Sequence, residues 1–357
     1  MAQGGPNSLV RIYAFSFIAT LATFLAVAFY GGPGALLTVL VLSALEITFS
    51  FDNAVVNAKV LEKMSPFWQK AFLTIGIVIA VFGMRLVLPI VLVAVTADLS
   101  MGDVVRLALD HPEEYAHHLE EAHPIIASFG GIFLLMIFIE FILDYGRKVH
   151  WLSKLEAPLV KIGRIRQVAP LLALITLAAV THFLAGEHKF EVMSSGILGL
   201  ILYLGIRSLA EVFELKHESQ MKKVGLDKKA LMRMGLINFL YLELLDASFS
   251  FDGVIGAFAI TNMVLLIAAG LGIGAVWVRS MTIHIVRRKT LLKYRYLDHG
   301  AHYAIGALAA MLLLGMKYEI PEAVTGTVGI GIIGFAFYSS WRYNQTHKPP
   351  EAVKHSL

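Results

Sequence analysis

Long apolar runs follow one another along this chain, separated by short polar segments. A helix rises 1.5 Å per residue, so about 20 apolar residues cross a bilayer core of about 30 Å. Ten segments fit that length, with bounds at 10–30, 34–60, 67–97, 123–145, 168–185, 192–214, 232–261, 263–286, 298–317 and 322–341. The pattern predicts an all-α polytopic membrane protein with about ten transmembrane helices, forming a single membrane domain over residues 1–357.

Lysine and arginine gather in every second connection between these segments. The basic connections are 59–70, 146–167, 215–231, 287–297 and the C-terminal tail, whereas 98–122 is an acidic loop and the others have no basic excess. An excess of lysine and arginine marks the cytoplasmic side of a membrane protein. Ten spans with both termini in the cytoplasm satisfy every connection, and we expect a multi-pass protein of the inner (plasma) membrane.

Composition supports the membrane class and excludes several chemistries. Charged residues make up 16% of the chain and hydrophobic residues 57%, with mean hydropathy +0.71, whereas soluble domains carry about 25% charged residues. The absence of cysteine excludes disulfides, thiolate metal sites and cysteine nucleophiles. The chain has neither an HExxH motif nor a GxxxxGK[ST] phosphate loop, so we expect neither an enzyme nor an ATP-driven pump, and no nucleic-acid partner.

The tetrapeptide FSFD occurs twice inside apolar runs, ending at Asp52 and at Asp252. A second carboxylate precedes each aspartate by six residues, Glu46 in the first copy and Asp246 in the second. The copies fall on the second and seventh predicted spans, which must cross the membrane in opposite directions. This arrangement is typical of inverted-topology repeats in secondary transporters. The predicted parts are a first repeat (34–145), connecting helices and basic loops (146–231), a second repeat (232–317), and a last helix with cytoplasmic tail (318–357).

Carboxylates inside a bilayer are costly, at about 2.5–3.5 kcal/mol each near the centre, and need a cation, a proton or an arginine. On a regular helix Glu46, Ser50, Asn53 and Asn57 form one polar stripe. In the second copy the stripe consists of Glu243, Asp246, Ser250 and Gly253. Asp52 and Asp252 lie about 120° from these stripes. A break in each helix would turn them toward the same cavity. Gly253 and Gly256 would ease a break in the second copy, whereas the first copy has no glycine there.

Carboxylate, amide and hydroxyl oxygens are hard ligands that suit Mg²⁺, Ca²⁺ or Mn²⁺. The candidate metal ligands are Glu46, Asp52, Asn53, Asp246 and Asp252. The candidate supporting or proton-relay residues are Ser50, Asn57, Glu243, Ser250, Arg85, Arg279 and Glu140. The cation would be a bound substrate, and no cofactor is expected. The structural alternative is that the carboxylates pair with Arg85 and Arg279, each in the apolar segment after a motif, and only tie helices together.

Glu46 together with FSFDNAVVNA resembles the acidic-plus-DNA segment of the TerC family of integral membrane proteins. The whole chain resembles an uncharacterised bacterial branch grouped with TerC in the LysE-type transporter superfamily. The resemblance implies an inverted-repeat helical fold and a role in metal-ion homeostasis, chiefly manganese export. It implies that Asp52, Asn53 and Asp252 are ligands, and that Glu46 and Asp246 are ligands or proton carriers. The second copy departs from the pattern, because Gly253 replaces the asparagine.

The sequence therefore predicts a secondary transporter that exports a divalent cation, with manganese first among the candidates. Expelling a divalent cation against an inside-negative potential costs about 4.6 kcal/mol per 100 mV, and proton antiport could supply that energy. An exporter of amino acids or other small cations is an alternative, with Arg85 or Arg279 as its anion-binding group. Another is a membrane scaffold that delivers metal to secreted proteins. The expected partners are the lipid bilayer and a divalent metal ion.

Overall fold

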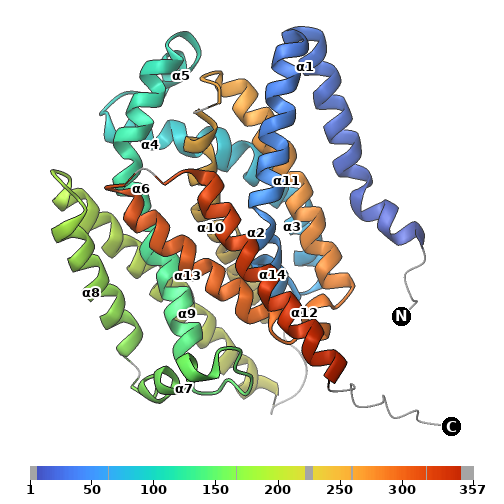
Figure 1. The fold of residues 1–357 in the computed structure, drawn as a ribbon, viewed down its shortest axis with the longest axis vertical. Helices are drawn as coiled ribbons and strands as arrows, with labels where there is room; N and C mark the ends of the chain where they lie inside the picture. Colours follow the sequence, from blue (N-terminus) through green and yellow to red (C-terminus); the bar gives the residue numbers. More distant parts are fainter. Residues whose placement is uncertain are drawn as a thin grey trace.

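The computed structural model describes residues 6–62, 64–165, 167–221, 228–258, 260–318 and 320–346, and the regular structure of these residues is entirely helical (Figure 1). The helices are α1 (Pro6–Phe49), α2 (Phe51–Glu62), α3 (Pro66–Val78), the π-helix η1 (Ile79–Val87), α4 (Leu88–Thr96), α5 (Met101–Asp110), α6 (Pro112–Leu143), α7 (Ser153–Ile162), α8 (Val168–Phe183), α9 (Lys189–Met221), α10 (Lys228–Phe258), α11 (Val264–Arg287), α12 (Thr290–Lys293), α13 (Leu297–Gly315) and α14 (Glu322–Thr346). Among the described residues, seven helices are long and apolar enough to cross a membrane. The predicted class of helical, polytopic membrane protein is confirmed.

Helix α1 is a hairpin of two arms that turns at Gly32, where φ is 75° and ψ is −174°. Only glycine adopts such a conformation without strain. The first arm runs antiparallel to α11, because Ser16 Oγ lies 2.8 Å from Ser280 Oγ and Tyr13 Oη lies 3.1 Å from His284 Nδ1. In the second arm, Glu46 lies against Gly274 and Leu42 lies against Gly270. That order is parallel to α11, so the two arms of α1 run in opposite directions (Figure 1).

The acidic segment 98–122, which we expected to be a loop, is largely helical. Ser100 Oγ accepts a hydrogen bond from Asp103 N at the start of α5, and Pro112 occupies the first turn of α6. Val104 and Ala108 are buried in one small apolar cluster together with residues of α6. Apolar residues spaced four apart therefore give this segment a buried helical face, which its high charge obscures.

Helix α6 forms much of the centre of the bundle, where it packs against α13, α9, α8 and α10. Its apolar residues Ile132, Phe133, Leu134 and Met136 are completely buried. The first arm of α1, by contrast, exposes large apolar side chains such as Phe17, 61% accessible. Exposed apolar side chains on a spanning helix are expected to face lipid.

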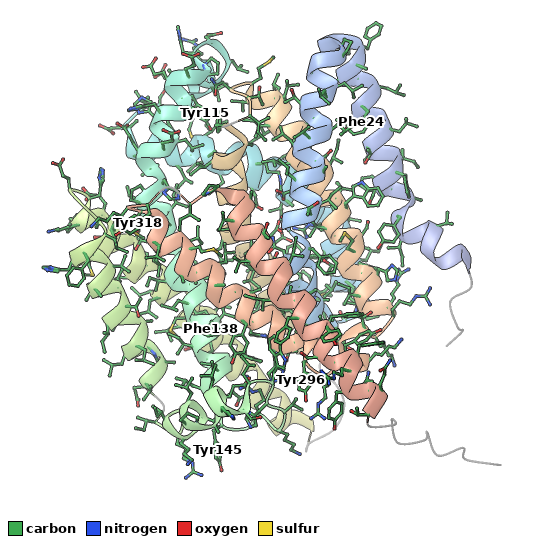
Figure 2. The ribbon with its side chains drawn as sticks, viewed as in Figure 1. Phe24, Tyr115, Phe138, Tyr145, Tyr296 and Tyr318 are labelled. Atoms are coloured by element: carbon green, nitrogen blue, oxygen red, sulfur yellow. The ribbon has the colours of Figure 1, made fainter. Side chains whose placement is uncertain are left out.

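The bundle has one acidic and one basic end. Figure 1 shows α5 at the upper end and α7 and α12 at the lower end, and Figure 2 places Tyr115 at the top and Tyr145 and Tyr296 at the bottom. The start of α1 reaches the basic end, because Tyr13 meets His284 near the end of α11. The end of α14 does too, because Asn344 Nδ2 donates to the Lys293 carbonyl. The described ends of the chain therefore lie at the same end of the bundle.

A fully buried carboxylate, Glu156 of α7, fastens the connection after α6 at the basic end. It accepts hydrogen bonds from Arg147 Nη2 (2.8 Å), from the Leu152 backbone N–H (3.1 Å) and from the Tyr303 hydroxyl of α13 (3.3 Å). Burial alone would raise the pKa of Glu156, but the Leu152 N–H and the positive charge of Arg147 favour the ionised form more strongly. The pKa of this carboxyl is therefore lowered from its ordinary value of 4.5.

We expect Glu156→Gln to lower the free energy of unfolding by about 3 kcal/mol at neutral pH, because it leaves the Arg147 guanidinium buried without its anion. Because the pKa of Glu156 is lower in the folded than in the unfolded protein, its ionised form stabilises the fold at pH values above the unfolded-state pKa of about 4.5. This stability is lost as the pH falls through the folded-state pKa. Thermal unfolding of the detergent-solubilised protein should show a gap between variant and wild type that closes in acid. Glu114→Gln, at an exposed position on α6, is the control, and an equal effect there would contradict the assignment.

Candidate cation site

Glu46 of the first motif copy forms a buried ion pair with Arg85 of η1. Arg85 Nη2 lies 2.5 Å from Glu46 Oε1, and the two side chains are 2% and 4% exposed. Ser50 Oγ donates to the same carboxylate oxygen at 3.2 Å, and Arg85 Nη1 donates to the Ala80 carbonyl at 2.8 Å. The wider turn of a π-helix carries this arginine, and such turns occur often at functional sites.

In the second copy, one arginine serves two carboxylates. Arg279 of α11 donates to Glu243 through both terminal nitrogens, at 3.1 and 3.0 Å, and to Asp246 Oδ2 at 3.2 Å. The guanidinium also donates to the Phe72 carbonyl at 3.1 Å and lies over the Phe72 ring. All three charged side chains are buried. If both carboxylates are ionised, this group carries one negative charge more than its guanidinium neutralises.

Two of the buried carboxylates, Glu46 and Glu243, each lie against a glycine from the other predicted repeat. A Cβ at Gly274 of α11 would lie 2.1 Å from Glu46 Cγ, and one at Gly76 of α3 would lie 2.6 Å from Glu243 Oε1. The sequence reasoning missed both glycines. Their signal was a small residue within an apolar span, which is how membrane helices approach one another closely.

Asp52 has a different environment from these paired carboxylates. Its side chain is buried, its Oδ1 accepts the Asn53 backbone N–H at 2.8 Å, and its Oδ2 faces Gly329 of α14. No lysine, arginine or histidine of the described residues forms an ion pair with it. On the same helix Asn57 is 1% exposed, and its Oδ1 has no hydrogen-bond partner. Together with the buried Asn53, α2 therefore presents oxygen-bearing side chains without a cationic partner.

The helix interruption occurs in the copy where we expected it less. Helix α1 ends at Phe49 and α2 begins at Phe51, although the Ser50 N–H still donates to the Glu46 carbonyl at 2.9 Å. Helix α10 runs without a break through the second motif, so the expectation of a break there, eased by Gly253 and Gly256, is wrong. Glycine is tolerated inside a membrane helix when neighbouring helices pack against it, and Gly253 is buried.

The predicted ligands lie in separate environments in this structure. Glu46 faces α11, Asp52 faces α14, and Asp246 faces Arg279. Among the described residues, no three carboxylate or histidine side chains are grouped closely enough to hold a metal. The side chain of Asp252 lies outside the described residues. Ser250 is buried on α10.

Glu140 of α6 lies apart from both motif groups. Its Oε2 accepts a hydrogen bond from the Tyr203 hydroxyl at 2.7 Å, and it forms an ion pair with Arg207 of α9. Both partners come from one helix and are spaced four residues apart, a pattern that could have indicated a shared face. The structure therefore places Glu140 in a polar group between α6 and α9.

The chain belongs to a family described as Protein of unknown function (DUF475), whose model matches residues 51–347. The match includes both FSFD aspartates and both buried arginines, whereas Glu46 precedes it. No curated protein and no solved structure matches the chain.

We expect Gly274→Ala to destabilise the fold, because the added methyl group would overlap the Cβ and Cγ of Glu46, a side chain held by Arg85. Overpacking of this kind typically costs about 1–3 kcal/mol. The measurement is the melting temperature of the purified variant. Gly331→Ala in α14 is the matched control, since a Cβ there meets nothing within 4 Å. Equal melting temperatures for the two variants would show that this contact is not tight.

Proposed function

We propose that this member of the DUF475 family is a secondary transporter that exports a divalent metal cation. The observation that carries the proposal is the set of buried oxygens on α2, namely Asp52, Asn53 and the unpartnered Oδ1 of Asn57. An isolated carboxylate at membrane depth needs a proton, an arginine or a metal cation to neutralise it. The other two buried carboxylate groups have arginines for this purpose, and a cation would serve Asp52.

We further propose ten transmembrane spans that include two inverted repeats. The hairpin form of α1 supports this count, because it supplies two passes in place of one continuous helix. With α1 counted as two passes, the seven long apolar helices give eight spans. Helices α8 and α10 supply the other two. The second arm of α1 runs parallel to α11. Helix α10 is joined to α11 by a short turn, so α10 would run antiparallel to α11. The two FSFD copies would then run in opposite directions and face each other across the Gly76 and Gly274 contacts.

Arg85 and Arg279 act, in this proposal, as internal counter-ions of the cation-free state. A guanidinium and a metal ion would compete for the same oxygens of Glu46, Glu243 and Asp246. Cation entry would therefore release an arginine from at least one group, and rocking of one repeat against the other offers a way to couple the exchange to transport. The Glu243 and Asp246 group, with two carboxylates for one arginine, already has the excess negative charge that favours a cation.

The same ion pairs favour a metal cation over an amino acid as substrate. An amino-acid exporter would need a group that binds the substrate carboxylate, and Arg85 and Arg279 were its candidates. Both guanidinium groups are buried and engaged by carboxylates of the protein. Oxygen ligands suit Mn²⁺, Ca²⁺ and Mg²⁺ alike. The resemblance to TerC-like proteins favours manganese, and proton antiport is the coupling that we propose for its export from the cytoplasm.

Asp52→Asn should abolish Mn²⁺ export into proteoliposomes or everted vesicles, because it removes the charge that the cation would neutralise while it keeps the shape of the side chain. Asp252→Asn should have the same effect if both motif copies supply ligands. Asp110→Asn, at the exposed end of α5, is the matched control. Transport by both motif variants at the wild-type rate would overturn the proposed site.

Arg279→Gln should increase the affinity for Mn²⁺, since it leaves Glu243 and Asp246 without their counter-ion. An unpaired buried charge costs about 3–5 kcal/mol, and recovery of even about 1.4 kcal/mol on cation binding would be a tenfold tighter dissociation constant. The measurement is the Mn²⁺-dependent shift in melting temperature of purified wild type, Arg279→Gln and Arg279→Lys. If the glutamine variant has a lower melting temperature and Mn²⁺ does not restore that temperature, Arg279 has only a structural role. It then joins α10 to α11, and its carboxylate partners do not bind a cation.

A further inference from the structure

A polar cavity of about 640 Å³ lies at the basic end of the bundle, outside the groups held by Arg85 and Arg279 and beside the Glu140–Arg207 pair. Its mouth is formed by exposed residues of the connection after α6, including Asp144 and Tyr145. Figure 2 shows Tyr145 at the lower end of the molecule. Its inner lining includes Ile137 and Tyr203, which are 6% and 8% exposed. The cavity therefore extends from the basic end into the helical core.

Both motif-bearing helices contribute to the wall of this cavity. Lys59 of α2 lies two residues beyond Asn57 and seven beyond Asp52, or about 10 Å along the helix axis. Tyr241 of α10 lies two residues before Glu243. The inner wall thus includes residues of α2 and α10 that are two positions along the chain from Asn57 and from Glu243. Lys59 shares a face of α2 with Asp52, because seven residues make about two helical turns.

The charges of the lining are compatible with a cation. Lys59 is bound to Asp298, with Nζ 2.7 Å from Oδ1, and Arg207 is paired with Glu140. Each of these positive charges therefore has a carboxylate partner. With Glu140 opposing Arg207 at the inner wall, Asp144 adds a further carboxylate at the mouth. A divalent cation with six waters occupies roughly 180 Å³, at about 30 Å³ for each water, so the cavity accommodates one with its hydration shell.

We propose that this cavity is the aqueous entrance through which a hydrated divalent cation reaches the motif helices from the basic end. The inference rests on the proposed export function, whose topology places this end in the cytoplasm. The structure then represents a state that is open to the basic side, in which Glu140, 17% exposed, is the first carboxylate beyond the mouth that an entering cation meets. Transfer toward Asp52 would follow α2 past Asn57.

The chain contains no cysteine, so single-cysteine variants can test the entrance without background. Ile137→Cys and Tyr241→Cys should react with a charged, membrane-impermeant thiol reagent in everted vesicles and not in intact cells. Leu134→Cys, on α6 but completely buried outside the cavity, should not react from either side. Glu114→Cys, exposed on α6 toward the acidic end, should react only in intact cells. Reaction of Ile137→Cys and Tyr241→Cys should be followed by loss of Mn²⁺ flux, and reaction of Glu114→Cys should not.

Failure of Ile137→Cys and Tyr241→Cys to react with the charged reagent would overturn the inference, as would reaction with a membrane-permeant apolar reagent alone. The entrance is also overturned if labelling leaves Mn²⁺ flux unchanged. If the labelling pattern holds but the unlabelled variants and the wild type carry no Mn²⁺, Ca²⁺ or Mg²⁺, the aqueous cavity stands and the proposed function fails. The two hypotheses are therefore separated by the same set of vesicles.

Discussion

Neutralisation of charge at membrane depth is the constraint on which the rest of this structure depends. Carboxylates cannot be solvated by lipid, so each must find an arginine, a proton, a metal or strong hydrogen-bond donors. Arg85 satisfies Glu46, and Arg279 is shared by Glu243 and Asp246. Helices α1, η1, α10 and α11 are held in register by these pairs. The same pairs place the excess negative charge where a transported cation could replace a guanidinium.

Close helix approach is the second requirement, and glycine provides it at the points where charge is buried. Glu46 packs against Gly274, Glu243 packs against Gly76, and Asp52 packs against Gly329, because none of these glycines has a side chain in the way. Any side chain at these positions would separate the helices and lengthen the ion pairs. Because Gly76 and Gly274 belong to opposite predicted repeats, the packing links the two halves reciprocally. A movement of one half would therefore change the packing around the buried carboxylates of the other half.

The two copies of the motif are unequal in chemistry. The first has an interrupted helix, two buried asparagines and an aspartate with no ionic partner among the described residues. The second has an uninterrupted helix and an additional carboxylate, Glu243, that shares Arg279. The polar cavity reaches both helices from the basic end. In the transport model this asymmetry assigns most neutral oxygen ligands to the first copy and most negative charge to the second.

The sequence by itself determined the helical membrane class and the positions of most helices, because each apolar run must form its backbone hydrogen bonds internally to cross lipid. It also identified Arg85, Arg279 and the motif carboxylates as buried charges. It misread 98–122, where high charge concealed an apolar face in α5 and early α6. The spacing of Arg85 from Asp52 gave no indication that Glu46 is its partner.

Only the tertiary structure decided which charges meet. Ion pairs, glycine contacts and the cavity arise where helices distant in sequence cross, as at Gly76 and Arg279, which are separated by more than half the chain. Local periodicity specifies which face of a helix is polar, but it contains no information about the neighbour that the face will meet. For this reason the sequence could predict the candidate residues, and could suggest that carboxylates pair with Arg85 and Arg279, but it could not assign the partner of each arginine.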